Sequence, residues 1–234
     1  MAYTKRSDER KMNELRPTSA KVGIVPNADG SAMFCQGDTI AIAAVYGPKI
    51  FNPKHCQNPE KGVLRVHYNM LSFSVGERIR PGVSRRSQEI SKVTEWALAP
   101  LVLLDELPGT VIDVHINILQ ANAGTRCAGI NAAAMALAHA GVPMTEMISA
   151  VAIGKIDDKI VTDVTKEEED YEEGEGATDI PLAFLSKTGD ITLFQLDGKI
   201  SPEQLKEAVK LGKKACKEVY ELQKKALKHV EEEI

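Results

Sequence analysis

The alternation of hydrophobic and polar positions predicts that the first half of the chain is rich in strands. Apolar stretches within residues 21–50 are interrupted by turn-forming residues at 27–30 and 36–39, which indicates consecutive strands. Residues 62–73 and 110–121 alternate in part, and each predicts a further strand. This half is therefore the first of two strand-rich blocks.

Two helices are predicted within and after this block. Ser84 is a favourable N-cap for the first of them. The apolar residues that follow fall at helical spacing: Ile90, Val93, Ala97 and Leu101. Pro100 should kink or restart this helix, because proline has no backbone N–H to donate. Residues 126–140 are alanine-rich and apolar all round, which predicts a buried second helix.

The second half predicts four short strands and a long final helix. Residues 148–164 contain two strands around a turn at 157–158, and residues 177–185 and 191–196 form two more. A capping box at 201–204 opens a helix that should run close to the C-terminus. This order predicts an α/β (α+β) layered fold, in which mixed sheets pack with helices in two similar βα halves.

The chain of 234 residues fits one domain over residues 18–234, preceded by an N-terminal arm at 1–17. We expect its halves to cover about 18–142 and 143–234. No membrane segment is expected, because the longest apolar run, at 97–104, is far shorter than the roughly 20 residues that span a bilayer. The N-terminus lacks the apolar core of a secretory signal, so we expect a cytoplasmic protein.

Charge is distributed unevenly along a chain whose net charge is −4. One stretch is basic, with few acids among these residues: Lys61, Arg65, Arg78, Arg80, Arg85, Arg86 and Lys92. Such a patch can hold a polyanion although the whole chain is acidic. The acidic run at 163–175 is expected to be, for the most part, a solvated flexible loop. The four cysteines lack zinc-site spacing, and we expect free thiols, with Cys127 and Cys216 buried in helices.

Three short features could carry chemistry. Residues 122–126 (NAGTR) join a strand to a helix, where free N–H groups, a glycine and an arginine suit a phosphate; an ordinary helix cap with a surface arginine is the alternative. Arg85 and Arg86 oppose the dipole of the helix they begin, which a bound polyanion would explain; a solvated pair near Glu89 is the alternative. Asp179 lies in an apolar strand close to Pro181, which indicates a strand edge or bulge near a cleft; a water-facing aspartate is the alternative.

Together these features are those of phosphoryl transfer, which depends mainly on positioning and charge stabilisation. The strand at 62–73 adds Arg65 on one face and Tyr68 on the other, although surface charge and packing also explain both. The sequence has no Walker A motif, which argues against a P-loop NTPase.

Three blocks of the chain, in order, resemble the signature blocks of RNase PH-type phosphorolytic ribonucleases. They are SRRSQEIS at 84–91, NAGTRCAGINAAAMAL at 122–137 and the acidic run ending in ATDIPLA at 177–183. The segments TKRSDER and LRVHYNM make the chain most similar to the catalytic subunit of the archaeal RNA exosome. The resemblance implies the RNase PH fold and degradation of single-stranded RNA from its 3′ end by inorganic phosphate. The products are nucleoside 5′-diphosphates, and the reverse reaction adds tails to RNA.

The resemblance also implies roles for individual residues. It assigns inorganic phosphate to four residues: Arg86, Gly124, Thr125 and Arg126. It assigns the RNA 3′ end to three: Arg65, Arg85 and Tyr68. Asp179 would be the essential acid, which either protonates the leaving 3′-oxygen or holds Mg²⁺. A second aspartate belongs a few residues earlier, and Asp170 is our choice, although the spacing here departs from the family pattern.

Members of this family form six-membered rings. The exosome type implies a paralogous non-catalytic partner subunit in the ring and RNA-binding cap subunits. Two alternatives remain open from the sequence: a homohexameric RNase PH that trims tRNA, and a non-catalytic ring subunit that binds RNA as a scaffold. The joint presence of Arg86, Arg126 and Asp179 argues against the scaffold.

Overall fold

The computed structural model describes residues 3, 5–172, 174 and 176–231. Its first sheet has five strands in the order β1-β2-β3-β5-β4. They are β1 (Thr18–Val22), β2 (Gly30–Gln36), β3 (Thr39–Ile50), β4 (Val63–Met70) and β5 (Thr110–Gln120). Only β4 and β5 pair in parallel among these strands. The strand-rich first block predicted from the sequence is therefore confirmed.

The second sheet has four antiparallel strands in the order β7-β6-β8-β9. They are β6 (Ile148–Ile156), β7 (Lys159–Thr162), β8 (Ala177–Leu185) and β9 (Ile191–Phe194). The helices are α1 (Arg85–Leu98), α2 (Thr125–His139), the short α3 (Lys166–Glu169) and the long α4 (Pro202–Glu231). Two single 3₁₀ turns, at Lys54–Cys56 and Leu104–Glu106, complete the described elements. The result is the mixed, layered α/β fold that the sequence predicts.

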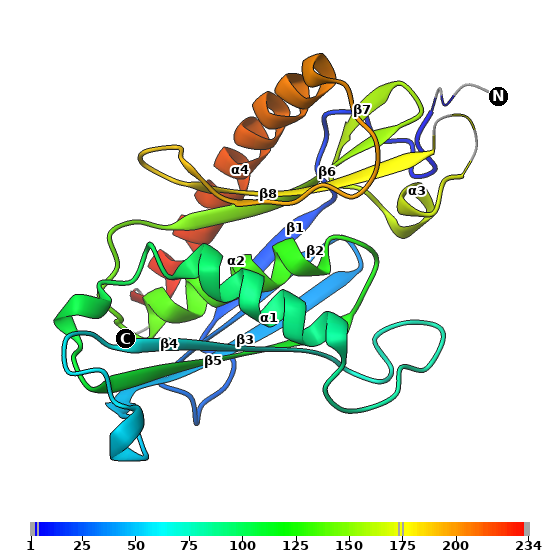
Figure 1. The fold of residues 1–234 in the computed structure, drawn as a ribbon. Helices are drawn as coiled ribbons and strands as arrows, with labels where there is room; N and C mark the ends of the chain where they lie inside the picture. The colour runs from blue at the N-terminus through cyan, green and yellow to red at the C-terminus, as the bar shows by residue number, and fades with distance from the viewer. Residues whose placement is uncertain (1–2, 4, 173, 175, 232–234) are drawn as a thin grey trace.

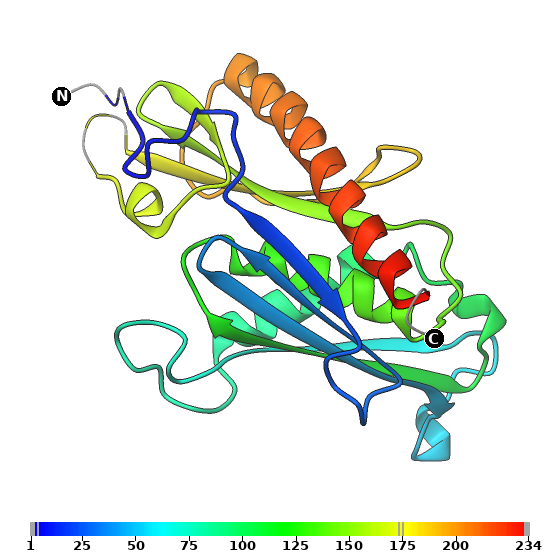
Figure 2. The ribbon, with the colours of Figure 1, turned by 180° about the vertical axis from the view of Figure 1, so that it is seen from behind.

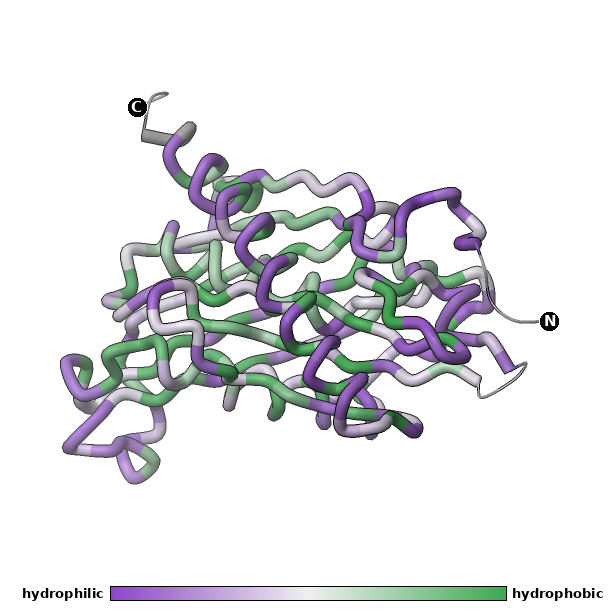
Figure 3. The backbone as a smooth tube through the Cα atoms, turned by 90° about the horizontal axis from the view of Figure 1, so that it is seen from above, coloured by the Kyte–Doolittle hydropathy of each residue, from purple (hydrophilic) through white to green (hydrophobic). Residues whose placement is uncertain are grey.

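Helix α2 lies between the two sheets, where it contacts β2 and β3 on one side and β6 on the other (Figure 1). Its run of alanines explains this position, because small side chains let both sheets approach the helix. At Gly30 the approach is so close that a Cβ atom would lie 2.4 Å from the carbonyl oxygen of Ala136. Helix α4 crosses the back of the molecule against β6 and β1 (Figure 2). Hydrophobic residues line the central strands, and hydrophilic ones gather in the peripheral loops (Figure 3).

Helix α1 differs from the prediction at its C-terminal end. Ser84 caps it as expected, in a reciprocal capping box with Ser87. The helix does not kink or restart at Pro100; it ends at Leu98, and Leu101 lies beyond it as a buried core residue. Pro100 cannot donate the next helical hydrogen bond, so the chain leaves the helix there.

The acidic run also differs from the prediction, because two of its members are buried. Asp163 is fully buried and Glu168 is 3% exposed, and each forms an ion pair with an arginine of the N-terminal arm. A buried carboxylate requires such a partner, which a pattern of local charge cannot reveal. Glu173 and Glu175 lie outside the described residues. Cys127 and Cys216 are buried, as expected. Among the described residues, no helix has both the length and the apolar character that crossing a bilayer requires.

Candidate active site

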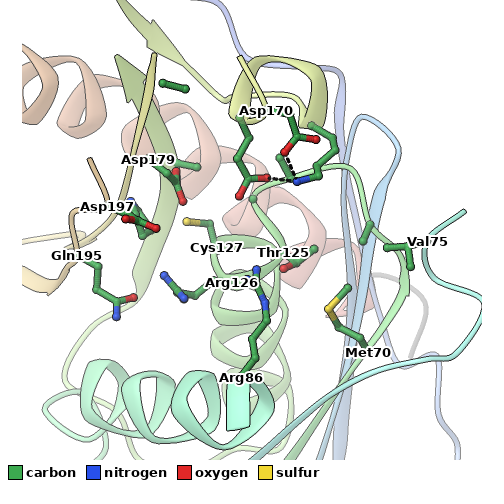
Figure 4. A pocket seen from close by; sticks show the side chains of 18 of the residues that line it. Met70, Val75, Arg86, Thr125, Arg126, Cys127, Asp170, Asp179, Gln195 and Asp197 are labelled. Carbon is green, nitrogen blue, oxygen red and sulfur yellow. Dashed lines mark hydrogen bonds and ion pairs between the residues drawn. The ribbon is translucent and has the colours of Figure 1, made fainter. Parts of the chain in front are cut away.

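A cavity of about 990 Å³ opens between the two sheets at the N-terminal end of α2 (Figure 4). Its walls come from both halves of the chain, since α1 and α2 face β8 and the segment after β9 across it. Six of the nine residues that the sequence nominated line it: Arg86, Gly124, Thr125, Arg126, Asp170 and Asp179. Residues more than 90 positions apart in the sequence therefore meet in one site.

The turn between β5 and α2 forms one wall and is shaped for an anion. Ala123 and Gly124 both have left-handed backbone conformations, with φ values of 56° and 62°. No side chain caps the N-terminus of α2, so its first N–H groups have no side-chain acceptor. Free N–H groups and the positive end of the helix dipole favour a phosphate there.

Two arginines add fixed positive charge next to this turn. Arg126 extends from the first turn of α2, and its Nη2 lies 3.3 Å from Oε2 of Glu89. The Nε of Arg126 is buried without a hydrogen-bond partner, which leaves a donor for a ligand. Arg86 reaches the cavity from the first turn of α1, and Figure 4 shows it close to Arg126.

Asp179 faces these arginines from β8. Its backbone exchanges two hydrogen bonds of 2.9 Å with Asp197, beyond the point where regular pairing of β8 with β9 ends. Pro181 lies between Asp179 and the last regular pair, Leu182 with Phe194, and it has no N–H to lose from the ladder. The expected strand edge or bulge at this proline is not present: β8 lies between β6 and β9, and its irregularity is at Ala183 and Phe184. Burial, followed by repulsion from Glu169 and Asp197, raises the pKa of Asp179 to about 6, although Arg126 and Arg86 oppose the shift. The surroundings of Asp179 therefore favour its protonated form more than those of an exposed aspartate do.

The other carboxylates of the cavity differ in their surroundings. Asp170 is largely exposed, and its Oδ1 accepts a hydrogen bond of 2.6 Å from Lys166 Nζ, which also pairs with Glu169. Mg²⁺ is commonly held by one or two carboxylates together with water and substrate phosphates. No cluster of three or more His, Cys, Asp or Glu side chains in the described part of the chain forms a complete metal cage. Asp179 and Asp197 lie opposite each other on paired segments and both line the cavity, so their carboxylates are of the type and number that suit Mg²⁺.

The three residues nominated for the RNA 3′ end are not brought into this cavity. Arg65 donates hydrogen bonds of 2.6 and 2.9 Å to Asp113 and lies over the ring of Phe51. Tyr68 is 4% exposed, its hydroxyl is buried without a hydrogen-bond partner, and burial raises its pKa. Arg85 is exposed at the start of α1. Their contact with RNA stays a prediction.

The sequence analysis missed several cavity residues. Gln195 lies within the strand predicted at 191–196 and Asp197 directly follows it, whereas the observed β9 ends at Phe194. Gln195 Nε2 donates a 2.9 Å hydrogen bond to Glu89. Extending that hairpin past its regular pairing would have placed Asp197 opposite Asp179. Lys166 and Glu169 gave no signal, because they lie within a charged run.

Comparisons with known proteins agree with this geometry. The model of the 3′ exoribonuclease family, domain 1, matches residues 14–143, and that of its domain 2 matches residues 146–215. The chain is 52% identical over 210 residues to exosome complex component Rrp41 of Thermococcus kodakarensis, covering 90% of this chain and 83% of that protein. It is 49% identical over 211 residues to the Rrp41 component of Methanopyrus kandleri, covering 90% and 87%.

Two solved structures share the fold. Rice (Oryza sativa) Rrp46 superposes with a TM-score of 0.83 at 27% identity, covering 95% of this chain and all of that one. A chain of the Archaeoglobus fulgidus exosome with RNA bound to the active site superposes with a TM-score of 0.78 at 21% identity, covering 93% and 92%. The second likeness concerns the fold alone.

Proposed function

This chain belongs to the 3′ exoribonuclease family of RNase PH type, and from that premise we propose that it is the phosphorolytic catalytic subunit of an exosome ring. It degrades single-stranded RNA from the 3′ end and releases nucleoside 5′-diphosphates. The observation that carries the proposal is one cavity in which a helix N-terminus and two arginines face the partly buried carboxyl of Asp179.

The reaction transfers one nucleotidyl group at a time. An oxygen of inorganic phosphate attacks the terminal phosphorus of the RNA, and the bond from that phosphorus to the 3′-oxygen of the preceding nucleotide breaks. The leaving oxygen takes up a proton, and the new phosphoanhydride bond leaves with the diphosphate. Because that bond keeps much of the free energy, the reaction runs in reverse and extends RNA when diphosphate is abundant.

Each residue of the cavity has a part in this step. The N–H groups at Gly124 and Thr125 and the guanidinium groups of Arg86 and Arg126 hold the attacking phosphate and stabilise the negative charge of the transition state. Asp179 lies opposite them, where its raised pKa lets it hold a proton for the leaving oxygen. In the alternative role, Asp179 would instead be ionised and would hold Mg²⁺ together with Asp197, and the metal would supply the charge stabilisation at the leaving oxygen.

The proposal includes the assembly in which the site works. As an exosome-type subunit, the chain alternates with a paralogous non-catalytic partner in a hexameric ring that carries RNA-binding caps, and it acts in the cytoplasm. The native mass of the purified chain, alone and with a candidate partner, distinguishes this hetero-hexamer from a homohexameric RNase PH. The anion site and Asp179 within one cavity argue against a purely scaffolding subunit.

Degradation is expected to require inorganic phosphate. The assembled protein should shorten a labelled single-stranded RNA only when phosphate is present, and chromatography should identify nucleoside diphosphates, because the anion site binds the attacking group. Replacement of phosphate by chloride at equal ionic strength is the control. Nucleoside monophosphates released in phosphate-free buffer would instead identify a hydrolytic nuclease.

Arg65→Ala and Arg85→Ala are expected to weaken RNA binding without changing its sequence preference. Each lost backbone contact should lower the slope of log affinity against log salt by about 0.7, the value for single strands. Lys225→Ala, at an exposed position of α4, is the control. Wild-type affinity and slope in both arginine variants would place the RNA path elsewhere.

A further inference from the structure

The N-terminal arm is bound to the rest of the fold through a buried ion pair next to the active site. The backbone N–H and the Nε of Arg16 donate to Oδ2 of Asp163 at 2.7 and 2.9 Å, and its Nη2 donates to Oδ1 at 2.6 Å. Arg16 is 5% exposed and Asp163 is fully buried. Asp163 follows β7 directly, so the pair joins the arm to the second sheet.

The same guanidinium also holds the phosphate turn. Arg16 Nη1 donates a 2.5 Å hydrogen bond to the carbonyl oxygen of Asn122, the residue at which the turn begins. A Cβ atom on Gly124 would lie 3.4 Å from Arg16 Nη2, so the guanidinium passes directly behind the turn. Thr39 completes the support, because its hydroxyl donates to the carbonyl of Ala123 and accepts from the N–H of Asn122.

Such support is physically required, because the turn is strained. Ala123 has a φ of 56°, a conformation that residues with a Cβ adopt only when the surroundings impose it. A strained turn relaxes when its contacts are removed, and the N–H groups that follow it then change direction. Arg16 does not line the cavity, and its charge is compensated by Asp163.

A second buried pair is connected to the turn through the start of α3. Arg6 Nε and Nη2 each donate a 2.8 Å hydrogen bond to Glu168, whose carboxylate also accepts the N–H of Thr165 at the start of α3. The next residue, Lys166, donates its N–H to Oδ1 of Asn122 at 2.9 Å. The arm therefore holds both the phosphate turn and the short helix that carries Asp170.

We propose that Arg16 is a positioning residue, which fixes the Asn122–Gly124 turn so that the N–H groups of α2 face the attacking phosphate. The N-terminal arm is then part of the phosphate site, although it contributes no ligand to it. This inference rests on the proposed phosphorolytic function. It gives a reason for the burial of Arg16 in an arm that is otherwise rich in exposed charge.

Arg16→Lys tests the role with little change in charge. A single ammonium can pair with Asp163 but cannot also reach the Asn122 carbonyl with fork geometry. We expect the KM for phosphate to rise about 10- to 100-fold, the penalty of a displacement of about 1 Å in a positioned site. The KM for RNA should stay unchanged. A merely destabilised protein would lose active molecules and kcat, but neither KM would move.

Two further variants keep the test decisive. Arg16→Met combined with Asp163→Asn removes both charges, which avoids an unpaired buried carboxylate and should preserve folding while the phosphate KM rises as in Arg16→Lys. Lys5→Met removes an exposed ion pair with Glu9 in the same arm and should leave both KM values unchanged. Inorganic phosphate should also raise the melting temperature of the wild type at lower concentrations than that of Arg16→Lys.

The possible results distinguish the positioning role of Arg16 from the proposed phosphorolytic function. An unchanged phosphate KM in the folded Arg16 variants overturns the positioning role, and so does an equal change in Lys5→Met. A wild-type protein that degrades RNA without phosphate overturns the proposed function instead, whatever the variants do.

Discussion

Asp179→Asn is expected to abolish both the degradation of RNA and its diphosphate-driven extension. The two directions share one transition state, so an amide that cannot supply a proton to the leaving oxygen blocks both. The loss should be at least about 100-fold in kcat, the lower range for removal of a general acid. RNA affinity should not fall, because the substitution removes a negative charge from a site that binds a polyanion.

Asp170→Asn is the matched control for this experiment. Asp170 lines the same cavity, but its carboxylate is exposed and already paired with Lys166. We expect a much smaller change in turnover. If Asp179→Asn folds, binds RNA and turns over at a near-normal rate while Asp170→Asn does not, the essential acid is Asp170 or a neighbour.

Asp179→Asn should also stabilise the folded protein at neutral pH. The folded-state pKa of Asp179, about 6, lies above its ordinary value of 3.8, so the folded protein holds this proton more tightly than the unfolded chain. The unfolding free energy therefore decreases as the pH rises from about 4 to about 6. Above pH 6 the folded protein carries the whole destabilisation that ionised Asp179 causes. A pKa raised by this amount corresponds to about 3 kcal/mol, which is an upper bound for the gain in Asp179→Asn.

Thermal unfolding at several pH values measures this effect. The variant should melt at a higher temperature than the wild type at pH 7, and the two curves should approach each other below about pH 4, where both proteins are uncharged at this position. If the wild type and Asp179→Asn melt at equal temperatures both at pH 7 and below pH 4, the folded structure does not raise the pKa of Asp179. An inactive variant that melts lower at pH 7 would assign Asp179 a structural role.

Those parts of the fold that depend on local pattern could be predicted from the sequence. The burial of α2 follows from its apolar residues on all sides, and the start of α1 follows from Ser84. The phosphate turn could be predicted for the same reason, since glycine, threonine and arginine at a strand-to-helix junction indicate an anion site without any information from distant segments. Only the resemblance to a family joined these pieces into one function.

Features that depend on pairing between distant segments could not be predicted. Asp197 lies beside Asp179 because of the register between two strands, and neither residue alone indicates it. Arg6 and Arg16 lie in a charged arm that looks solvated, yet their partners, Glu168 and Asp163, lie well over 100 positions away. A charged side chain is buried only together with its partner, so the sequence of one segment alone does not indicate that its charge is buried.

Arg126→Lys is expected to lower kcat/KM for phosphorolysis by about 100- to 1,000-fold, the usual cost of removing one donor to a developing charge. The side chain of Arg126 is 19% exposed and pairs with Glu89, and its buried Nε has no hydrogen-bond partner. Lysine keeps the charge but loses the planar fork that matches phosphate oxygens. The loss should appear in the phosphate KM as well as in kcat, since the group contacts both the ground state and the transition state.

Lys92→Met provides the control, because Lys92 carries the same charge on neighbouring α1 but pairs with Glu95 outside the cavity. It should leave both phosphate constants unchanged, which would show that the effect of Arg126 does not arise from the general positive potential. Arg126→Met should lose more activity than Arg126→Lys, because it removes the charge together with the fork. If Arg126→Lys retains wild-type constants, the charge alone is sufficient. In that case phosphate is oriented by the backbone N–H groups of α2, with Arg86 as the remaining side-chain donor.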